Sequence, residues 1–433
     1  MSRLDEIADV GAMELFPFVG PEHRFYSHIA RLRTEVSRQP LWRETMHRTS
    51  PTAVRTLMRA RRLPRGEWGL KWVSVSFQSR DAWTSRFDAL TLFYSAKTQR
   101  VEAYEFPHDP CLRTAASFFG DAASGPLMRG SDLDVDVCRY IPRQRLTFLV
   151  RRRSDGGVPV VGKFVRNAEL ERAYEVLGEV HHAVARTRPL FAVAAPRGID
   201  RNAEVFFQEA RSAEPLTVRL ETDRSSDVFR SVGAIHRDVH TLDVRHVPTW
   251  SVRDFLESLE AHVQWIAFFF PAHASFLEDV RGLLIKDVPR IDPDGHAFCH
   301  GDFRCSHVLQ DDGSSVVIDF DGAMRADPYL EVANLITLLK HDVPAFVQRF
   351  ADAAQDPTDL LKAACDAYLE GYQERARQTL DPKRLLWYRI GCEIRYLART
   401  IARDLLDPIR FDRLIRLLHD LSAQYRRDGA RSS

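Results

Sequence analysis

The feature that most constrains the fold of this chain is a short stretch in which acids and histidines surround one hairpin pattern. Residues 316–318 form a β-branched run after turn residues, which predicts a strand, and residues 308–310 predict its hairpin partner. The hairpin would bring Asp302 and His307, before the first strand, close to Asp319 at the end of the second. Two carboxylates and an imidazole at one point suit phosphoryl transfer. One carboxylate can accept the proton of an attacking hydroxyl while the other residues hold a metal ion against nucleotide phosphates.

Two motifs in this stretch carry a family resemblance, namely His300-Gly301-Asp302 and Ile318-Asp319-Phe320-Asp321. They resemble the aminoglycoside phosphotransferase and choline kinase superfamily, which is itself similar to protein kinases. The resemblance implies that Asp302 is the catalytic base, that His300 shapes the loop through hydrogen bonds, and that Asp319 holds a metal ion. The family's Asn position holds His307, which becomes the second expected metal ligand. The resemblance also implies ATP and Mg²⁺ as cofactors. An amide oxygen suits Mg²⁺ whereas an imidazole suits softer metals, so His307 makes Mn²⁺ possible as well.

A second acidic motif follows the hairpin. It resembles the family's Asp-Pro-x-x-Asp-Leu-Ala, with Asp327 and Pro328 at its start and Glu331 in place of the second Asp. In relatives the second acid braces the catalytic loop, so the resemblance implies this role for Glu331. An ordinary acid at a helix N-terminus is compatible with the same pattern. Asp321 and Asp327 are expected to give structural support beside the site.

The region before the hairpin has the element order of a kinase N-lobe. Residues 132–140, 145–152 and 158–165 predict three strands, and residues 168–186 predict an amphipathic helix after them. Lys163, in the third strand, is the only lysine between positions 98 and 285. A lysine among apolar neighbours is costly unless it meets an anion, so it is interpreted as the ligand of the nucleotide α/β-phosphates. The alternative is an edge-strand lysine that points to water.

Three further residues are assigned to nucleotide binding from their place along the chain. Glu175, favoured over Glu171, is expected to pair with Lys163 as the helix glutamate of protein kinases does. Gln208 and Ala210 lie in a run that resembles the strand and hinge where adenine would hydrogen-bond to the backbone. Position is the whole basis of this second assignment.

Residues after the hairpin predict a helical C-terminal region, with amphipathic helices over residues 364–372, 387–404 and 411–425. In the family such helices frame the pocket of the acceptor substrate. Glu393 and Arg395 are therefore candidates to face that pocket.

The first 128 residues are expected to form an additional α+β domain, similar to the cap that precedes the kinase lobes in maltokinase-like relatives. Residues 1–66 predict mainly helices, including a basic helix over residues 53–63. That basic run has two interpretations, a solvated helix face or a contact for an anionic partner. Further on, period-two alternation predicts three strands, over residues 71–77, 87–94 and 100–106.

Two other patterns are interpreted as decoys. Residues 235–238 look like the protein-kinase catalytic loop, but Asp243 stands where its Asn belongs, and the spacing of residues 229–236 is helical. A C-lobe helix is therefore expected there. A set of zinc-type side chains lacks the spacing of a structural zinc site, and it comprises His296, Cys299, His300, Cys305 and His307.

Composition excludes several other classes of protein. The formal net charge is +1, so bulk electrostatics favour neither nucleic acid nor a membrane surface as a partner. The six cysteines show no paired spacing and no signal peptide is recognised, so a cytoplasmic protein with reduced thiols is expected. The most apolar run, residues 265–271, is too short to span a bilayer. The oligomeric state is left open.

The sequence therefore predicts an α+β chain with a two-lobed protein-kinase-like fold and an additional N-terminal α+β domain. The expected divisions are residues 1–128 for the extension, 129–212 for the N-lobe and 213–433 for a mainly helical C-lobe, with the catalytic hairpin at 298–322. The expected reaction is ATP-dependent transfer of the γ-phosphate to a hydroxyl of a small-molecule metabolite, and the maltokinase likeness favours a sugar or other polyol. The alternative is a catalytically degraded, nucleotide-binding or scaffold protein. It is motivated by His307 and by the lack of a G-x-G-x-x-G loop, whose place residues 139–143 occupy.

Overall fold

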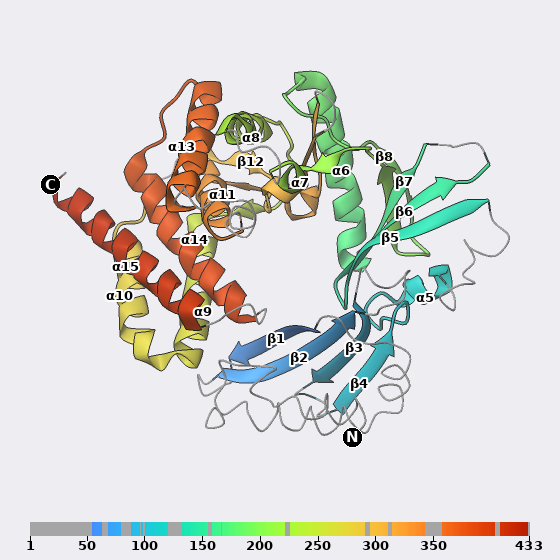
Figure 1. Cartoon of the computed structure of the whole chain (residues 1–433), viewed down its shortest axis with the longest axis horizontal. Coiled ribbons are helices and arrows are strands. Elements are labelled where there is room, and N and C mark those ends of the chain that lie inside the picture. Colours follow the sequence, from blue (N-terminus) through green and yellow to red (C-terminus); the bar gives the residue numbers. More distant parts are fainter. Residues whose placement is uncertain are drawn as a thin grey trace.

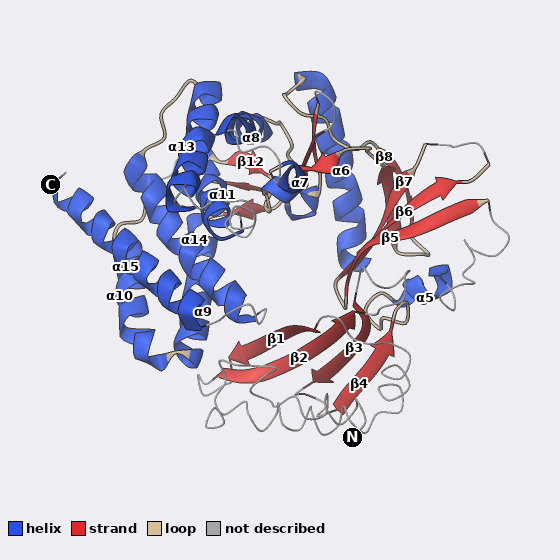
Figure 2. Ribbon diagram, viewed as in Figure 1, coloured by secondary structure: helices blue, strands red, loops and turns tan. Residues whose placement is uncertain are grey.

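The computed structural model shows a mainly helical lobe and two larger antiparallel sheets (Figures 1 and 2). The described residues are 54–62, 68–78, 88–95, 97, 100–119, 132–154, 158–165, 167–220, 226–290, 295–310, 314–342, 357–402 and 408–431. Helices expected within residues 1–53 lie outside this part of the chain. The α+β class and the two-lobed, kinase-like arrangement of the prediction are confirmed.

The N-terminal extension is built on a four-stranded antiparallel sheet in which each strand pairs with the next along the chain. Its strands are β1 (Val54–Arg62), β2 (Trp68–Gln78), β3 (Asp88–Ser95) and β4 (Arg100–Glu105). The last three confirm the period-two pattern. The basic helix predicted over residues 53–63 is wrong, because residues 54–62 pair with β2, from Val54 opposite Phe77 to Arg62 opposite Trp68. The sequence of this run is compatible with a strand as well as with a helix. Its pairing with β2 selects the strand.

The N-lobe is a five-stranded antiparallel sheet with the order β5-β6-β7-β9-β8 and one long helix. Its elements are β5 (Leu133–Ile141), β6 (Arg145–Arg152), β7 (Val160–Phe164), α6 (Asn167–Thr187), β8 (Pro196–Asp200) and β9 (Val205–Glu209). Helix α6 buries Leu170, Ala173 and Leu177 together with Phe206 of the sheet. The three strands and the helix confirm the predicted order, and Lys163 lies within β7.

The other face of the N-lobe sheet is covered by the segment that follows β4. Phe106, and Phe119 from α5 (Arg113–Phe119), share one buried cluster with Phe148 and Phe164. The ring centroids of Phe119 and Phe148 lie 5.3 Å apart in an edge-to-face arrangement. Each such buried ring stabilises the fold by about 1.5–3 kcal/mol. Residues on both sides of the expected boundary at residue 128 therefore share one core.

The C-lobe is a set of helices around the largest hydrophobic core among the described residues. These helices are α7 (Leu216–Arg219), α8 (Ser226–Val239), α9 (Val252–Phe269), α10 (Ala274–Lys286), α11 (Pro328–Asp342), α13 (Pro357–Ala376), α14 (Pro382–Ala402) and α15 (Pro408–Arg431). Trp387 on α14 is fully buried, and its indole N–H donates to the Leu284 carbonyl at 3.0 Å. Helix α8 confirms the helix predicted in place of a kinase-type loop at residues 235–238.

Short strands hold the predicted hairpin between the helices. β13 (Val308–Gln310) pairs with β14 (Ser315–Val317), which confirms the hairpin, and β10 (Glu214–Pro215) extends it. A second small sheet contains β11 (Thr249–Trp250), β15 (Met324–Ala326) and β12 (Ala297–Cys299). Ala192 exchanges backbone hydrogen bonds of 2.8 and 2.9 Å with Ser315 and Val317, which ties the segment after α6 to the hairpin.

Helix α6 is the element that brings the two lobes together. In Figure 1 it stands between the N-lobe sheet and the helical C-lobe, with the N-terminal sheet below the N-lobe sheet. It contacts β8 and β9 on one side and the short helix η4 (Phe320–Gly322), next to Asp319, on the other. In the described ranges, no helix combines the length and the apolar character needed to cross a membrane.

Candidate active site

The loop of residues 300–304, which follows β12 and which the motifs predict to be the catalytic loop, is shaped by a buried imidazole. The His300 side chain is fully buried, and its Nε2–H donates to the Ile318 carbonyl at 2.8 Å. Its Nδ1 accepts from the Asp302 backbone N–H at 3.3 Å. His300 therefore joins the catalytic loop to the end of the hairpin and fixes the path of the chain at Asp302.

The loop also makes a close backbone approach that only glycine allows. Gly301 has φ +84°, and a Cβ atom built there would lie 1.9 Å from the carbonyl oxygen of Gly322. Asp319, which precedes η4, has φ 73° and ψ 48°, a left-handed conformation that is uncommon for residues other than glycine and that often occurs at functional sites. Both strained positions lie where the catalytic loop meets the end of the hairpin.

His307 and Asp319 turn lone pairs towards each other. His307 ends the short helix η3 (Cys305–His307), and its Nδ1–H donates to the Asp302 carbonyl at 2.9 Å, so Nε2 is the nitrogen without a proton. Burial lowers the pKa of His307 to about 4, which keeps the ring neutral at pH 7. Nε2 lies 3.5 Å from Oδ2 of Asp319. A neutral imidazole nitrogen and a carboxylate oxygen at this separation fit the donor set of one divalent cation.

Two cations from the N-lobe reach Asp319. Nζ of Lys163 lies 2.9 Å from Oδ1, and Nη1 of Arg145, the first residue of β6, lies 3.0 Å from Oδ2. Lys163 also lies 3.4 Å from Oδ1 of Asp321. Burial alone would raise the pKa of Asp319, but Lys163 and Arg145 hold it well below its ordinary value. Burial alone would lower the pKa of Lys163, but Asp321 and Asp319 raise it, so both sides of the contact are charged at neutral pH.

Asp302 is more exposed than the other acids of the site. Its side chain is 32% exposed, against 12% for Asp319 and 28% for Asp321. Oδ1 of Asp302 accepts from Arg304 within the loop. Asp302 and Asp319 both act electrostatically on His307, which places the two carboxylates around one imidazole. The three residues that the motifs predicted to meet are therefore neighbours.

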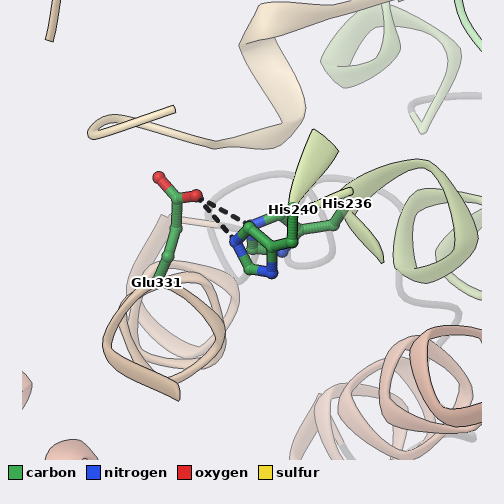
Figure 3. A group of neighbouring side chains, drawn as sticks. All are labelled: His236, His240 and Glu331. Atoms are coloured by element: carbon green, nitrogen blue, oxygen red, sulfur yellow. Dashed lines mark hydrogen bonds and ion pairs between the residues drawn. The ribbon is translucent and has the colours of Figure 1, made fainter. Parts of the chain in front are cut away.

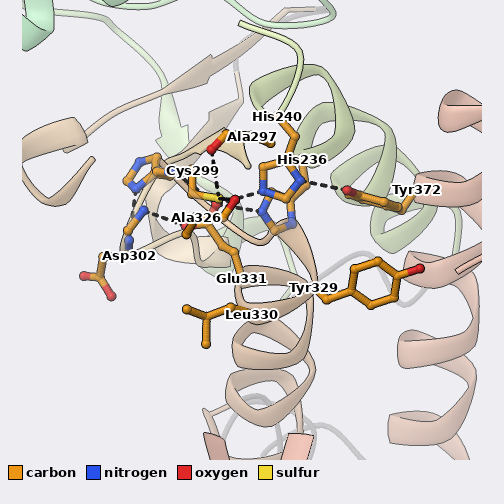
Figure 4. Close-up of polar contacts among 12 residues, drawn as sticks. His236, His240, Ala297, Cys299, Asp302, Ala326, Tyr329, Leu330, Glu331 and Tyr372 are labelled. Carbon is orange, nitrogen blue, oxygen red and sulfur yellow. Dashed lines mark hydrogen bonds and ion pairs between the residues drawn. The ribbon is translucent and has the colours of Figure 1, made fainter. Parts of the chain in front are cut away.

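Glu331, near the start of α11, is a buried carboxylate that connects the catalytic loop to α8. It accepts from the backbone N–H groups of His300 at 3.0 Å and Gly301 at 2.6 Å. Its Oε2 also accepts from Nε2 of His236 at 3.1 Å and of His240 at 3.0 Å, at the end of α8 (Figures 3 and 4). Burial alone would raise the pKa of Glu331, but the hydrogen bonds from the two imidazoles hold it well below its usual value.

Each of these histidines has a second partner on α13. Nδ1 of His236 lies 2.7 Å from the Tyr368 hydroxyl, and Nδ1 of His240 lies 2.7 Å from the Tyr372 hydroxyl. Two histidines and a glutamate at this spacing could hold a metal ion, but both ring nitrogens of each imidazole already have partners. The cluster is a completed hydrogen-bond network that braces the loop. Sequence reasoning missed it, although both the histidine pair and the tyrosine pair are spaced i, i+4, which puts each pair on one helix face.

Asp321 lies in η4, and Asp327 directly precedes α11. Asp327 is 2% exposed, accepts from the Tyr329 backbone N–H at 3.1 Å, and pairs with Arg384 of α14 at 2.6 Å. Burial, together with the neighbouring Asp319 carboxylate, raises the pKa of Asp321. Asp327 thus holds the start of α11, while Asp321 lies beside the cations of the site.

The comparison with known families agrees with this geometry. A family model described as "Phosphotransferase enzyme family" (APH) matches residues 143–377. The chain belongs to this phosphotransferase family. It is a phosphotransferase with a hydroxyl acceptor, which favours an enzyme over the non-catalytic alternative. No curated protein matches the chain in sequence.

Several solved structures resemble this APH-family chain at low sequence identity. Amicoumacin kinase hAmiN is 14% identical, with 66% of this chain and 88% of that chain covered and a TM-score of 0.47. The macrolide 2′-phosphotransferase MphH from Brachybacterium faecium is 19% identical, with 63% and 85% covered and a TM-score of 0.41. A choline/ethanolamine kinase family protein from Mesorhizobium loti is 13% identical, with 71% and 92% covered and a TM-score of 0.44.

The structure brings some of the expected nucleotide-binding residues of this phosphotransferase together. Lys163 and Gln208 line one small pocket between the lobes, whose apolar walls include Leu177 and Phe320. Ala210, which follows β9, is not free at its backbone, because its N–H donates to the Pro159 carbonyl at 3.1 Å. A contact from adenine to this N–H would have to break that hydrogen bond.

The structure does not form the expected pair between Glu175 and Lys163. Glu175 is exposed on α6, and the anionic partners of Lys163 are the two aspartates of the hairpin end. The face of α6 that packs on the sheet carries Ala173 and Leu177. Glu175, between them in the sequence, therefore lies on the opposite face and points to water. From the same helix, Arg172 donates to the Asp321 carbonyl at 3.3 Å. Helix α6 therefore offers the site a cation where the prediction expected an acid.

Proposed function

We propose that this phosphotransferase moves the γ-phosphate of ATP to a hydroxyl of a small metabolite, with Asp302 as the catalytic base. The observation that carries the proposal is the meeting of Lys163, Asp319 and His307 beside the loop that bears Asp302. Lys163 comes from the N-lobe and the other residues come from the C-lobe. A cation for phosphates, a metal-binding pair and a base at one point are what phosphoryl transfer requires.

In this proposal Asp319 and His307 hold a divalent cation, and Lys163 contacts the α/β-phosphates. A divalent cation bound there neutralises negative charge on the phosphate oxygens. We propose Mg²⁺ as the usual ion and Mn²⁺ as an ion that His307 makes competitive, because an imidazole nitrogen binds the softer Mn²⁺ more readily than it binds the hard Mg²⁺. The neutral state of His307 at pH 7 leaves its Nε2 lone pair ready for this role.

Asp302 has one carboxylate oxygen available for the acceptor hydroxyl. Its Oδ1 accepts from Arg304, whereas none of the described residues bonds to Oδ2. Because the side chain is 32% exposed, a substrate hydroxyl can reach Oδ2 and hand over its proton as the phosphate is transferred. His300 fixes the loop in the position from which Asp302 acts.

The acceptor remains a prediction, with a sugar or other polyol suggested by the maltokinase likeness alone. One of the two candidates to face the acceptor pocket, Glu393, is buried in the protein interior. Glu393 is 1% exposed and bonds to Thr337 at 3.3 Å and to His341 at 2.6 Å, so it belongs to the packed interior between α11 and α14. Its carboxylate is therefore part of a buried network and does not line an open pocket.

Asp302→Asn tests the proposed base. The amide cannot accept a proton, so turnover should fall by at least about a hundredfold, while the melting temperature and the affinity for ATP with Mg²⁺ stay near wild type. The matched control is Asp366→Asn, at an exposed position on α13, which should keep full turnover. Turnover in Asp302→Asn equal to that of the control would remove Asp302 from the reaction.

A further inference from the structure

The turn in the position of the kinase phosphate loop offers no free backbone amide to a phosphate. It joins β5 to β6 through Pro142, Arg143 and Gln144. Pro142 has no N–H group. The Arg143 N–H donates to the Asp109 carboxylate at 2.6 Å. The Gln144 N–H donates to the Ile141 carbonyl at 3.0 Å. Since glycine-rich loops bind phosphates through unpaired amides, a side chain has to take over this task here.

Arg145 is the side chain that reaches the site from this turn. Its Nη1 lies 3.0 Å from Oδ2 of Asp319, while Lys163 occupies Oδ1 at 2.9 Å. Thr147, two residues after Arg145, lies opposite Lys163 in the β6–β7 ladder. Arg145 and Lys163 therefore leave the same face of the sheet. Each oxygen of the carboxylate assigned to the metal is bonded to one N-lobe cation.

We propose that Arg145 is a triphosphate-binding residue that takes the place of the missing glycine-rich loop. Without nucleotide, Arg145 pairs with Asp319 and so keeps this metal ligand from binding a cation. When a nucleoside triphosphate enters, Arg145 and Lys163 exchange Asp319 for phosphate oxygens. Asp319 is then released to the divalent cation, so nucleotide and metal each raise the affinity for the other. This inference rests on the proposed function, because it takes Asp319 as a metal ligand and Lys163 as a phosphate ligand.

The N-terminal extension supports the turn that carries Arg145. Asp109 is 2% exposed and accepts from the Arg143 N–H and, at 2.9 Å, from the Tyr140 hydroxyl. The guanidinium carbon of Arg143 lies 3.6 Å from the ring centroid of Phe93 in β3. A cation over an aromatic face and a buried carboxylate cap hold the turn in one conformation. Arg145 is thus presented from a fixed support, and the extension acquires a part in nucleotide binding.

Arg145→Gln tests the inference through binding measurements that do not depend on activity. Affinity for ATP in the presence of Mn²⁺, measured by calorimetry, should fall by about ten- to a hundredfold, which is the size of a lost hydrogen bond between charged groups. Affinity for Mn²⁺ without nucleotide, measured by electron paramagnetic resonance, should rise by about tenfold, because Asp319 loses a competing cation. A side chain with only a structural role would not give this pair of opposite changes.

Two further variants keep the test decisive. Arg151→Gln changes an exposed arginine on the same strand and the same face, and both affinities should stay unchanged. Arg145→Lys keeps the charge but loses the planar fork, so its affinities should lie between wild type and Arg145→Gln, and it serves if the glutamine variant does not fold. ATP affinity equal to wild type in Arg145→Gln, or Mn²⁺ affinity that does not rise, overturns the inference alone. A wild-type chain that binds neither ATP nor Mn²⁺ overturns the proposed function as well.

Discussion

Replacing Glu331 by Gln would remove the charge of the brace beneath the catalytic loop while keeping its size. The carboxylate accepts four hydrogen bonds, from the backbone N–H groups of His300 and Gly301 and from Nε2 of His236 and His240. Three of these donors bond to Oε2 and one, the Gly301 N–H, bonds to Oε1. A glutamine side chain has one acceptor oxygen, which can replace Oε2, and its nitrogen is a donor that would then face the Gly301 N–H. The substitution therefore tests whether the buried network holds the loop.

The size of the effect follows from the donor that loses its acceptor and from the lost charge. One buried donor left unsatisfied, the Gly301 N–H, costs about 1–3 kcal/mol. The other three donors keep an acceptor in the amide oxygen, but their hydrogen bonds lose the negative charge that strengthens them. We therefore expect the free energy of unfolding to fall by about 2–4 kcal/mol. A domain with a stability of about 5–15 kcal/mol would remain folded.

Urea unfolding followed by circular dichroism measures this change, and turnover with ATP measures its consequence. The matched control is Glu370→Gln on α13, an exposed glutamate paired with Arg230, whose loss should cost less than about 1 kcal/mol. In Glu331→Gln, kcat should fall more than KM changes, because the loop that carries Asp302 loses its support. Stability and kcat equal to those of the control would show that Glu331 does not hold the catalytic loop.

Two other predictions follow from the histidines. His307→Asn restores the amide of the family pattern, so the ratio of kcat/KM with Mg²⁺ to that with Mn²⁺ should rise by about tenfold, and an unchanged ratio would count against His307 as a metal ligand. Burial, with neighbouring His240, lowers the pKa of His236 to about 4, whereas an unfolded histidine titrates near about 6.5. Between these two values the unfolded chain binds a proton that the folded chain does not, so stability should be unaffected above pH 6.5 and fall as the pH is lowered towards 4. His307, whose pKa burial also lowers to about 4, contributes in the same direction, and each of the two histidines should account for about 2 kcal/mol at pH 5. Stability measured from urea midpoints should therefore be about 4 kcal/mol lower at pH 5 than at pH 7.5, and equal stability at the two pH values would contradict the prediction.

The sequence was sufficient for the parts of the site whose chemistry is local. The His-Gly-Asp motif and the β-branched run after it lie on either side of one hairpin, so the proximity of Asp302, His307 and Asp319 follows from strand pairing of neighbours. Lys163 could be singled out because a cation within an apolar strand needs an anion. The structure supplies two such anions, Asp319 and Asp321.

The remaining features depend on contacts between distant segments, which a sequence pattern does not fix. The basic run at residues 54–62 fits a helix and a strand, and its pairing with β2 chooses the strand. Glu175 lies on the expected helix, but the rotation of α6 against the sheet turns it to water. Arg145 and Asp109 gain their importance only when the N-terminal extension packs against the N-lobe turn.

The proposed active site depends most directly on whether His307 binds the metal ion beside the nucleotide. Pulsed electron paramagnetic resonance of the Mn²⁺–ATP complex detects a nitrogen nucleus bonded to the ion. We predict a ¹⁴N coupling of an imidazole in the wild-type complex that disappears in His307→Asn while Mn²⁺ stays bound. A wild-type complex without that coupling, or a variant that keeps it, would contradict the placement of the cation between His307 and Asp319.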